Sequence, residues 1–139
     1  MVNLAELLAT KKPKVGAILF IAIDGHGGSG KSTLAEWLSH KLNATLIHTD
    51  DFASWDNPLN WWPLVIQRIF SPIANGATAL SYPRSQWSEG HMRDPIVNQP
   101  VTKIMILEGV SSLRKEFRAY ISLGIFVDAP KNVCHLREV

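Results

Sequence analysis

Short runs dominated by apolar residues recur along the chain and alternate with segments of helical spacing. The runs cover residues 17–23, 44–49, 103–107 and 124–128, and several are rich in β-branched side chains. Continuous apolar runs of this length are typical of strands that are buried on both faces of a parallel sheet. We therefore expect four such strands.

The segments between the strands predict helices. Residues 31–42 carry one apolar stripe, which is made by Leu34, Trp37, Leu38 and Leu42. This stripe would place Trp37 in the core. Further helices are predicted at 4–8, at 61–70, at 111–120 and from Pro130 onward. The stretch 78–100 contains several prolines and little periodicity, so we expect a loop there that covers a site.

Composition excludes several classes of protein. The chain has 139 residues, of which 46% are hydrophobic and 19% charged, so it can bury a core and is not intrinsically disordered. The net charge of +2 comes without a dense basic block, which argues against a nucleic-acid or membrane partner. A single cysteine excludes an internal disulfide, and we expect a cytoplasmic location. No apolar run approaches the roughly 20 residues of a membrane-spanning helix.

The segment 25–32 reads GHGGSGKS and matches the pattern G-x-x-x-x-G-K-[ST] without a gap. Its glycines permit a tight loop whose backbone N–H groups converge on phosphate oxygens, and the following helix adds its positive end. Lys31 could reach the transferred phosphoryl group, and the Ser32 hydroxyl could bind Mg²⁺. The predicted ATP-binding residues are Gly25, His26, Gly27, Gly28, Ser29, Gly30, Lys31, Ser32 and Thr33.

The position of this motif between a buried strand and an amphipathic helix also predicts the fold. Strands that alternate with helices imply right-handed crossovers and a parallel sheet with helices on both faces. The expected fold class is α/β, with a three-layer α/β/α P-loop NTPase fold and a mainly parallel sheet. One domain would span residues 1–139.

Carboxylates follow three of the predicted strands, at the edge where open parallel sheets bind their ligands. Asp50 could accept a proton from an acceptor hydroxyl, with capping of the loop as the alternative. For Asp51, capping of the next turn is favoured, and contact with the acceptor is the alternative. Glu108 ends a strand in the pattern of an apolar run followed by Glu-Gly, so we expect it to hold Mg²⁺, with helix capping as the alternative. Asp128 is interpreted as structural.

Three stretches together resemble the uridine kinase-like group of P-loop nucleoside and nucleotide kinases. They are IAIDGHGGSGKSTLA at 21–35, HTDDF at 48–52 and ILEGV at 106–110. The resemblance implies an ATP- and Mg²⁺-dependent kinase that phosphorylates a hydroxyl of a small molecule, such as a nucleoside like uridine. It also implies catalytic roles for Lys31 and for Asp50, the latter as the base that takes the hydroxyl proton. Gln86 stands where many members of the family have an Asp that holds sugar hydroxyls, so the identity of the acceptor stays open.

Two segments are expected to cover the acceptor. They contain four tryptophans, Trp55, Trp61, Trp62 and Trp87, which could stack on a planar substrate or pack the cover against the sheet. Arg84 and Arg93 could hold an anionic acceptor, although arginines at such positions are more often solvated. The candidate acceptor residues are therefore Asp51, Trp55, Arg84, Trp87 and Arg93.

Members of the uridine kinase-like group, which this chain resembles, continue past the position of Arg137 into an arginine-bearing lid. We therefore expect the domain to lack this lid and the elements that follow it. An arginine at the transferred phosphoryl group can contribute several orders of magnitude in rate. The alternative to a kinase is accordingly a nucleotide-binding module, or a kinase remnant, without efficient phosphoryl transfer.

Overall fold

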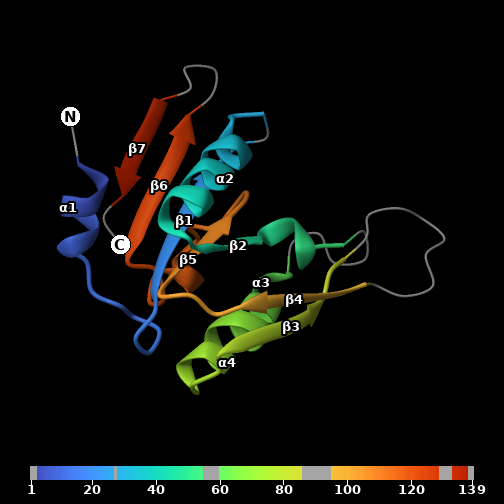
Figure 1. Ribbon diagram of the computed structural model, residues 1–139. Helices are drawn as coiled ribbons and strands as arrows, with labels where there is room; N and C mark the ends of the chain where they lie inside the picture. Colours follow the sequence, from blue (N-terminus) through green and yellow to red (C-terminus); the bar gives the residue numbers. More distant parts are fainter. Residues whose placement is uncertain (1–2, 27, 55–59, 86–94, 129–132, 138–139) are drawn as a thin grey trace.

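The computed structural model describes residues 3–26, 28–54, 60–85, 95–128 and 133–137 (Figure 1). This part of the chain forms a five-stranded sheet and a separate two-stranded sheet. The order in the larger sheet is β2-β5-β1-β6-β7, with the bounds Thr45–His48, Ile104–Glu108, Leu19–Gly25, Leu123–Asp128 and Val133–Arg137. All neighbours are parallel except β6 and β7, which confirms a mixed α/β fold with a mainly parallel sheet.

The central strand β1 is buried along its whole length. It pairs with β5 on one side and with β6 on the other, and Ile21 lies opposite both Ile106 and Leu123. A strand with two neighbours and two covered faces has no solvent-facing side, which explains its continuous apolar sequence.

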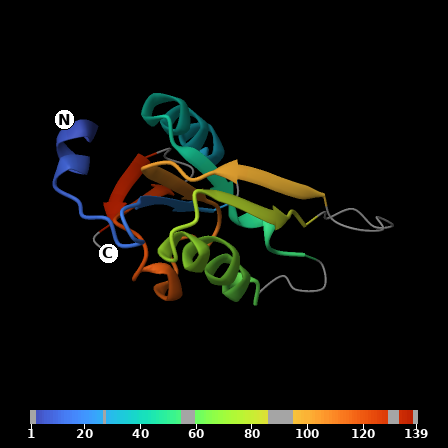
Figure 2. The same ribbon diagram turned by 60° about the horizontal axis from the view of Figure 1, so that its bottom comes forward.

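Helices cover both faces of this sheet, as Figure 2 shows. Alternate residues of a strand point to opposite faces. Phe20 accordingly belongs to the cluster beneath the helical segment α3 (Trp62–Val65), η2 (Ile66–Phe70, a π-helical turn) and α4 (Ser71–Ala74). Ile21 belongs to the cluster beneath α1 (Leu4–Ala9) and α2 (Lys31–Leu42). No helix in the described residues is long and apolar enough to span a bilayer.

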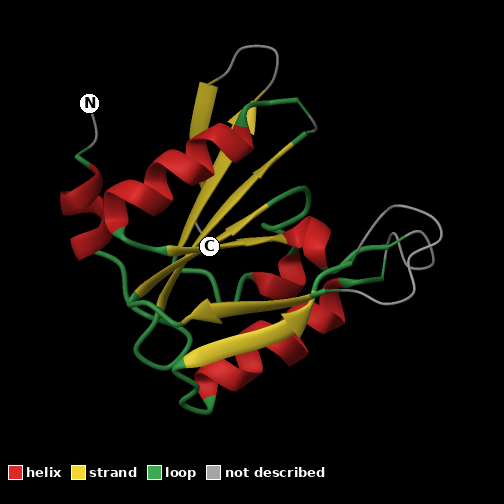
Figure 3. Ribbon diagram, turned by 45° about the vertical axis from the view of Figure 1, so that its right-hand side comes forward, coloured by secondary structure: helices red, strands yellow, loops and turns green. Residues whose placement is uncertain are grey.

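The predicted loop at 78–100 is wrong, because its described ends form a β-hairpin, shown in Figure 3. Strand β3 (Ala79–Pro83) pairs antiparallel with β4 (Ile96–Pro100). Leu80 and Tyr82 are buried while their neighbours are exposed or half-buried, so the strand has the period of two that a half-buried strand requires. Pro83 and Pro100 end the two strands, and proline is tolerated there.

Two predicted helices are also wrong. Residues 111–120 contain only a 3₁₀ turn, η3 (Lys115–Phe117). The backbone leaves the right-handed helical region at Ser111, where φ is +69°, and at Arg114, where ψ is 154°, so no α-helix runs through the segment. The helix expected from Pro130 is replaced by β7, since the free edge of β6 offers backbone partners for an antiparallel strand. Residue 130 itself lies outside the described residues.

Trp37 does not lie in the core. Its side chain is 56% exposed, and Lys41 Nζ lies 5.5 Å from the ring centroid. The buried face of α2 is instead centred on Ala35 and Leu38. At about 100° per residue, Trp37 is about 200° from Ala35 around the helix, and so it faces solvent.

Candidate active site

The phosphate-binding motif lies at the carboxyl edge of the sheet, between the end of β1 and the start of α2. Its first residue, Gly25, passes close to β6: a Cβ there would lie 2.5 Å from the Val127 carbonyl oxygen and 2.8 Å from Ser29 Oγ. Only glycine allows this approach, so the motif begins with the loop held against the neighbouring strand.

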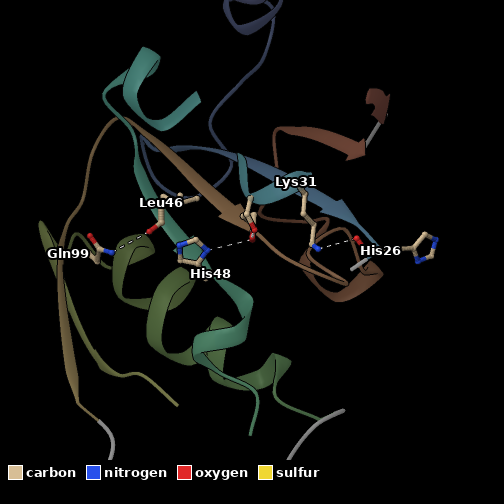
Figure 4. Close-up of polar contacts among 7 residues, drawn as sticks. His26, Lys31, Leu46, His48 and Gln99 are labelled. Carbon is tan, nitrogen blue, oxygen red and sulfur yellow. Dashed lines mark hydrogen bonds and ion pairs between the residues drawn. The ribbon is translucent and has the colours of Figure 1, made fainter. Parts of the chain in front are cut away.

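Lys31 is half-buried at the first position of α2. Its Nζ donates a hydrogen bond of 3.2 Å to the His26 carbonyl oxygen, so the ammonium group lies over the loop (Figure 4). Ser29 is buried, and its hydroxyl has no hydrogen-bond partner within the described residues. A loop with a cation above it and an unpaired hydroxyl inside it fits a bound triphosphate.

The other predicted nucleotide-binding residues share the solvent-facing side of this loop. His26, Gly28, Gly30, Ser32 and Thr33 are all exposed, whereas Gly27 lies outside the described residues. The twelve-residue helix α2 begins directly behind them, and its free N–H groups carry partial positive charge. The exposed surface of the motif is therefore one that attracts an anion.

Glu108 joins three elements at this edge. The Ser32 hydroxyl on α2 donates a hydrogen bond of 2.9 Å to Oε1, and His48 at the end of β2 has Nδ1 3.5 Å from Oε2 (Figure 4). Glu108 itself ends β5 and is only 5% exposed. Both oxygens of this buried carboxylate therefore have partners. The alternative that Glu108 caps a helix beginning at Ser111 is wrong, because no α-helix forms there.

Electrostatic interactions keep the Glu108 side chain charged. Burial alone would raise the pKa of Glu108, but the hydrogen bonds from His48 and Ser32 outweigh burial and hold the pKa below its ordinary value. The same contact with Glu108 is the main reason that the pKa of His48 is raised. Glu108 is therefore a carboxylate at neutral pH, as a cation ligand must be.

Ser32 and Glu108 together suit Mg²⁺. Within the described residues, no group of three or more His, Cys, Asp or Glu side chains is arranged to hold a metal ion. Mg²⁺ in nucleotide-binding proteins needs only one or two protein oxygens, because water and phosphate supply the others. A hydroxyl bonded to a charged carboxylate beside the phosphate loop provides those oxygens.

Asp50 and Asp51 lie in the 3₁₀ turn η1 (Thr49–Asp51), which follows β2 directly. His48 is paired in register with Glu108, so Asp50 stands two residues beyond that pair. Asp50 is exposed, whereas Asp51 is half-buried. Burial raises the pKa of Asp51, and the positive charges of His48 and Arg84 partly oppose this rise.

The hairpin is anchored to the same turn. The Ser85 N–H donates to the Asp51 carbonyl oxygen at 2.8 Å, which brings the hairpin end that carries Arg84 to η1. At its other end, Gln99 Nε2 donates to the Leu46 carbonyl oxygen at 3.3 Å (Figure 4). The described parts of the hairpin therefore lie beside η1 and β2.

Of the predicted acceptor residues, only Asp51 and Arg84 can be placed. Trp55, Trp87 and Arg93 lie outside the described residues. Arg114 was not among the predicted site residues; its guanidinium lies 5.2 Å from the Trp62 ring and 6.0 Å from the Trp61 ring. No sequence signal distinguishes it, because the contact joins segments far apart in the chain.

Asp24, the residue before Gly25, was not among the predicted site residues. It is 9% exposed, and its carboxylate accepts N–H groups from Gly25 at 2.6 Å, Ser111 at 3.0 Å and Leu113 at 2.9 Å. The sequence does carry a signal for it, because Asp24 is a carboxylate that directly follows a continuous apolar run.

Comparison with known proteins places this geometry in a known fold. No protein-family model matches the chain, and no curated protein sequence matches it. A solved structure described as a possible uridine kinase from Bacillus stearothermophilus superposes with a TM-score of 0.72. The alignment covers 91% of this chain and 78% of that one, at 23% sequence identity.

The chain shares the fold of that protein. At this sequence identity the likeness shows the fold alone, and it agrees with the predicted α/β fold with a mainly parallel sheet. The phosphate loop, Glu108 and Asp50 occupy the carboxyl edge of the sheet, where α/β folds of this kind bind their ligands.

Proposed function

We propose that the protein is an ATP-dependent phosphotransferase that phosphorylates a hydroxyl group of a small molecule. One observation carries the proposal: the hydrogen bond between Ser32 and Glu108 ties the phosphate loop to the strand that lies beside β2, and β2 leads into Asp50. The residues proposed to bind phosphate, to bind the metal and to act as the base therefore lie at one edge of the sheet.

Each of these residues has a distinct task. Lys31 lies above the loop, and its ammonium group would move from the His26 carbonyl to a phosphate oxygen. Ser32 and Glu108 would hold Mg²⁺, directly or through water. When bound, ATP with Mg²⁺ supplies the phosphoryl group and the metal charge that stabilises its transfer.

Asp50 would act as the general base. It is exposed at the end of the strand next to β5, so an acceptor hydroxyl can approach it from solvent. Its carboxylate would orient that hydroxyl and take its proton during transfer. Its exposure distinguishes Asp50 from Asp51, which is half-buried and whose backbone carbonyl accepts the Ser85 N–H.

The acceptor would lie between η1 and the hairpin. Arg84 and Asp51 line this side, and Trp55, Trp87 and Arg93 are proposed to complete it. The likeness to a possible uridine kinase makes a nucleoside such as uridine the first acceptor to test. We further infer a three-layer P-loop kinase domain, because helices lie on both faces of the sheet.

The deciding experiment measures product formation with Mg²⁺ and ATP. A panel of nucleosides, sugars and vitamin alcohols would be incubated with the protein, and the phosphorylated product identified by mass. Lys31→Ala should lose the activity, whereas Lys41→Ala, a matched change further along the same helix, should keep it. Retained ATP binding with no product from any acceptor would favour a nucleotide-binding module instead.

A further inference from the structure

Ser111 has an unusual backbone conformation. Among the described residues, two other than glycine have a positive φ: Asn43 at +50° and Ser111 at +69°. Asn43 caps the end of α2, where this conformation is common and asparagine tolerates it. Ser111 ends no helix, and its side chain disfavours the left-handed region by roughly 5- to 30-fold. Some other contact must therefore stabilise it.

That contact is the Asp24 carboxylate. Oδ1 accepts the N–H groups of Gly25 and Ser111, and Oδ2 accepts the N–H of Leu113. Asp24 is buried at the end of β1, so these three backbone groups satisfy a charge-bearing side chain that has little access to water. One carboxylate thus joins the first residue of the phosphate loop to the loop that follows Glu108.

The loop after Glu108 continues toward Trp62 at the start of α3. The Ser111 carbonyl oxygen accepts the N–H of Arg114 at 3.1 Å, and the Arg114 guanidinium lies over the ring of Trp62. A chain of contacts therefore runs from Gly25 through Asp24 and Ser111 to Arg114. One end, Gly25, is the first residue of the predicted phosphate loop, and the other, Arg114, lies beside the first turn of α3.

We propose that Asp24 is a positioning residue that holds Ser111 in its left-handed conformation and so keeps the loop after Glu108 in register with the phosphate loop. Its consequence for phosphoryl transfer rests on the proposed function. Asp24 touches no reacting atom in this role: it acts through Ser111 and through the backbone of Gly25.

The first test follows the loop and needs no enzymatic activity. In Asp24→Asn, the new amide can accept on one atom only, so it places an N–H against one of the three backbone donors. Hydrogen exchange measured by NMR should quicken by roughly 10- to 100-fold at the amides of Ser111, Leu113 and Arg114. The amides of β5 should remain protected. Unchanged exchange at all three loop amides would overturn the proposal.

The second test asks whether backbone strain is what Asp24 offsets. Glycine adopts a φ of +69° without penalty, so Ser111→Gly added to Asp24→Asn should recover roughly 5- to 30-fold of the lost protection. Ser111→Gly alone should change little. If the double variant exchanges as fast as Asp24→Asn, the link to Ser111 is wrong and Asp24 is only a structural carboxylate.

A third variant covers the case in which Asp24→Asn does not fold. Ser111→Val leaves the carboxylate intact but sets a β-branched residue at a left-handed position. It should quicken loop exchange in the same places. Unchanged exchange in this variant would also contradict the proposal.

The consequence for transfer is measured on the same variants. Asp24→Asn should lower kcat by roughly 10- to 100-fold with less than about threefold change in the Kd of ATP, and Ser111→Gly should restore part of kcat. Glu36→Gln, an exposed change on α2, is the control. A wild-type protein that transfers phosphate to no acceptor would contradict the proposed function, while the exchange measurements would still decide the role of Asp24.

Discussion

The Ser32 hydroxyl donates a hydrogen bond of 2.9 Å to the Glu108 carboxylate, and the two residues are separated by 76 positions in the chain. The bond joins the first turn of α2 to the end of β5. A metal ion that binds Ser32 therefore meets a buried negative charge next to it. The proposed binding of Mg²⁺ by Glu108 can therefore be tested separately from the proposed binding of nucleotide by the loop.

Glu108→Gln should raise the Mg²⁺ concentration required for activity by roughly tenfold or more, because it keeps the shape of the side chain but removes its charge. Metal-free nucleotide binding should weaken much less. Mg²⁺ titrations of transfer, beside calorimetry of ATP in EDTA, measure the two effects. Glu36→Gln is the matched control, and a titration identical to wild type would reassign Glu108 to a structural role.

Lys31→Ala should weaken ATP binding by about 1.5–3 kcal/mol, since a charge-assisted contact with phosphate is lost. The fold should remain, because the Nζ hydrogen bond to the His26 carbonyl oxygen lies on an exposed loop. Isothermal titration calorimetry measures the loss, and circular dichroism checks the fold. ATP affinity equal to that of Lys41→Ala would contradict a phosphate role for Lys31.

Asp50→Asn should reduce phosphoryl transfer by about 10²–10⁴-fold, the usual effect of losing a general base. ATP affinity should change little or rise slightly, because one negative charge near the triphosphate disappears. Single-turnover kinetics and ATP binding are measured on the same preparation. An unchanged transfer rate would place the base elsewhere, with Asp51→Asn as the next variant.

The pair formed by His48 and Glu108 should make folding stability depend on pH. The pKa of His48 is raised above 6.5, so its contribution is complete below pH 6.5 and is lost as the pH rises through the folded pKa. The pKa of Glu108 is lowered below 4.5, so its contribution is complete above pH 4.5 and is lost as the pH falls through the folded pKa. The pair should therefore stabilise the protein most between pH 4.5 and 6.5.

Urea unfolding of wild type and His48→Gln across this range measures that dependence. The difference in the free energy of unfolding should be largest between the two limits and should shrink toward pH 8 and toward pH 3. His40→Gln, an exposed histidine on α2, should show no such profile. A difference between wild type and His48→Gln that does not vary with pH would contradict the ion pair.

Gly109→Ala should destabilise the protein by roughly 2–5 kcal/mol. Gly109 has a φ of +142°, and a Cβ there would overlap the Thr49 side chain at the start of η1. Backbone strain and overpacking therefore add. Gly76→Ala is the matched control, since its φ of +94° carries a similar strain but its Cβ would meet nothing within 4 Å.

Chemical denaturation measures both glycine variants, and the control should lose only about 1–2 kcal/mol. Thr49→Ala, combined with Gly109→Ala, should recover part of the larger loss by removing the overlapping atoms. Equal destabilisation by the two glycine variants would show that contact with Thr49 is unimportant.

The elements that the sequence predicts correctly are those whose signal is local. The apolar run of β1 requires two covered faces wherever it lies, and the glycines before Lys31 permit a phosphate loop by their own backbone freedom. The helix at Lys31–Leu42 agrees with its predicted bounds because its periodicity lies within one segment. The sequence likewise predicts that Asp50 and Glu108 lie at the same edge of the sheet, because the carboxyl ends of parallel strands all lie there.

Other features were decided only by contacts between distant segments. The stretch after Glu108 does not form a helix, because Ser111, whose N–H bonds to the Asp24 carboxylate, has a φ of +69° that no right-handed helix contains. Trp37 lies in solvent because the sheet contacts the face of α2 that carries Ala35 and Leu38. The sequence by itself therefore determined the buried strands and the glycine-rich turn between β1 and α2, because the signals for both are local. Only the tertiary structure decided which backbone N–H groups each carboxylate accepts, as it did for Asp24. These partners lie on different strands and loops, so they depend on the order of the strands in the sheet.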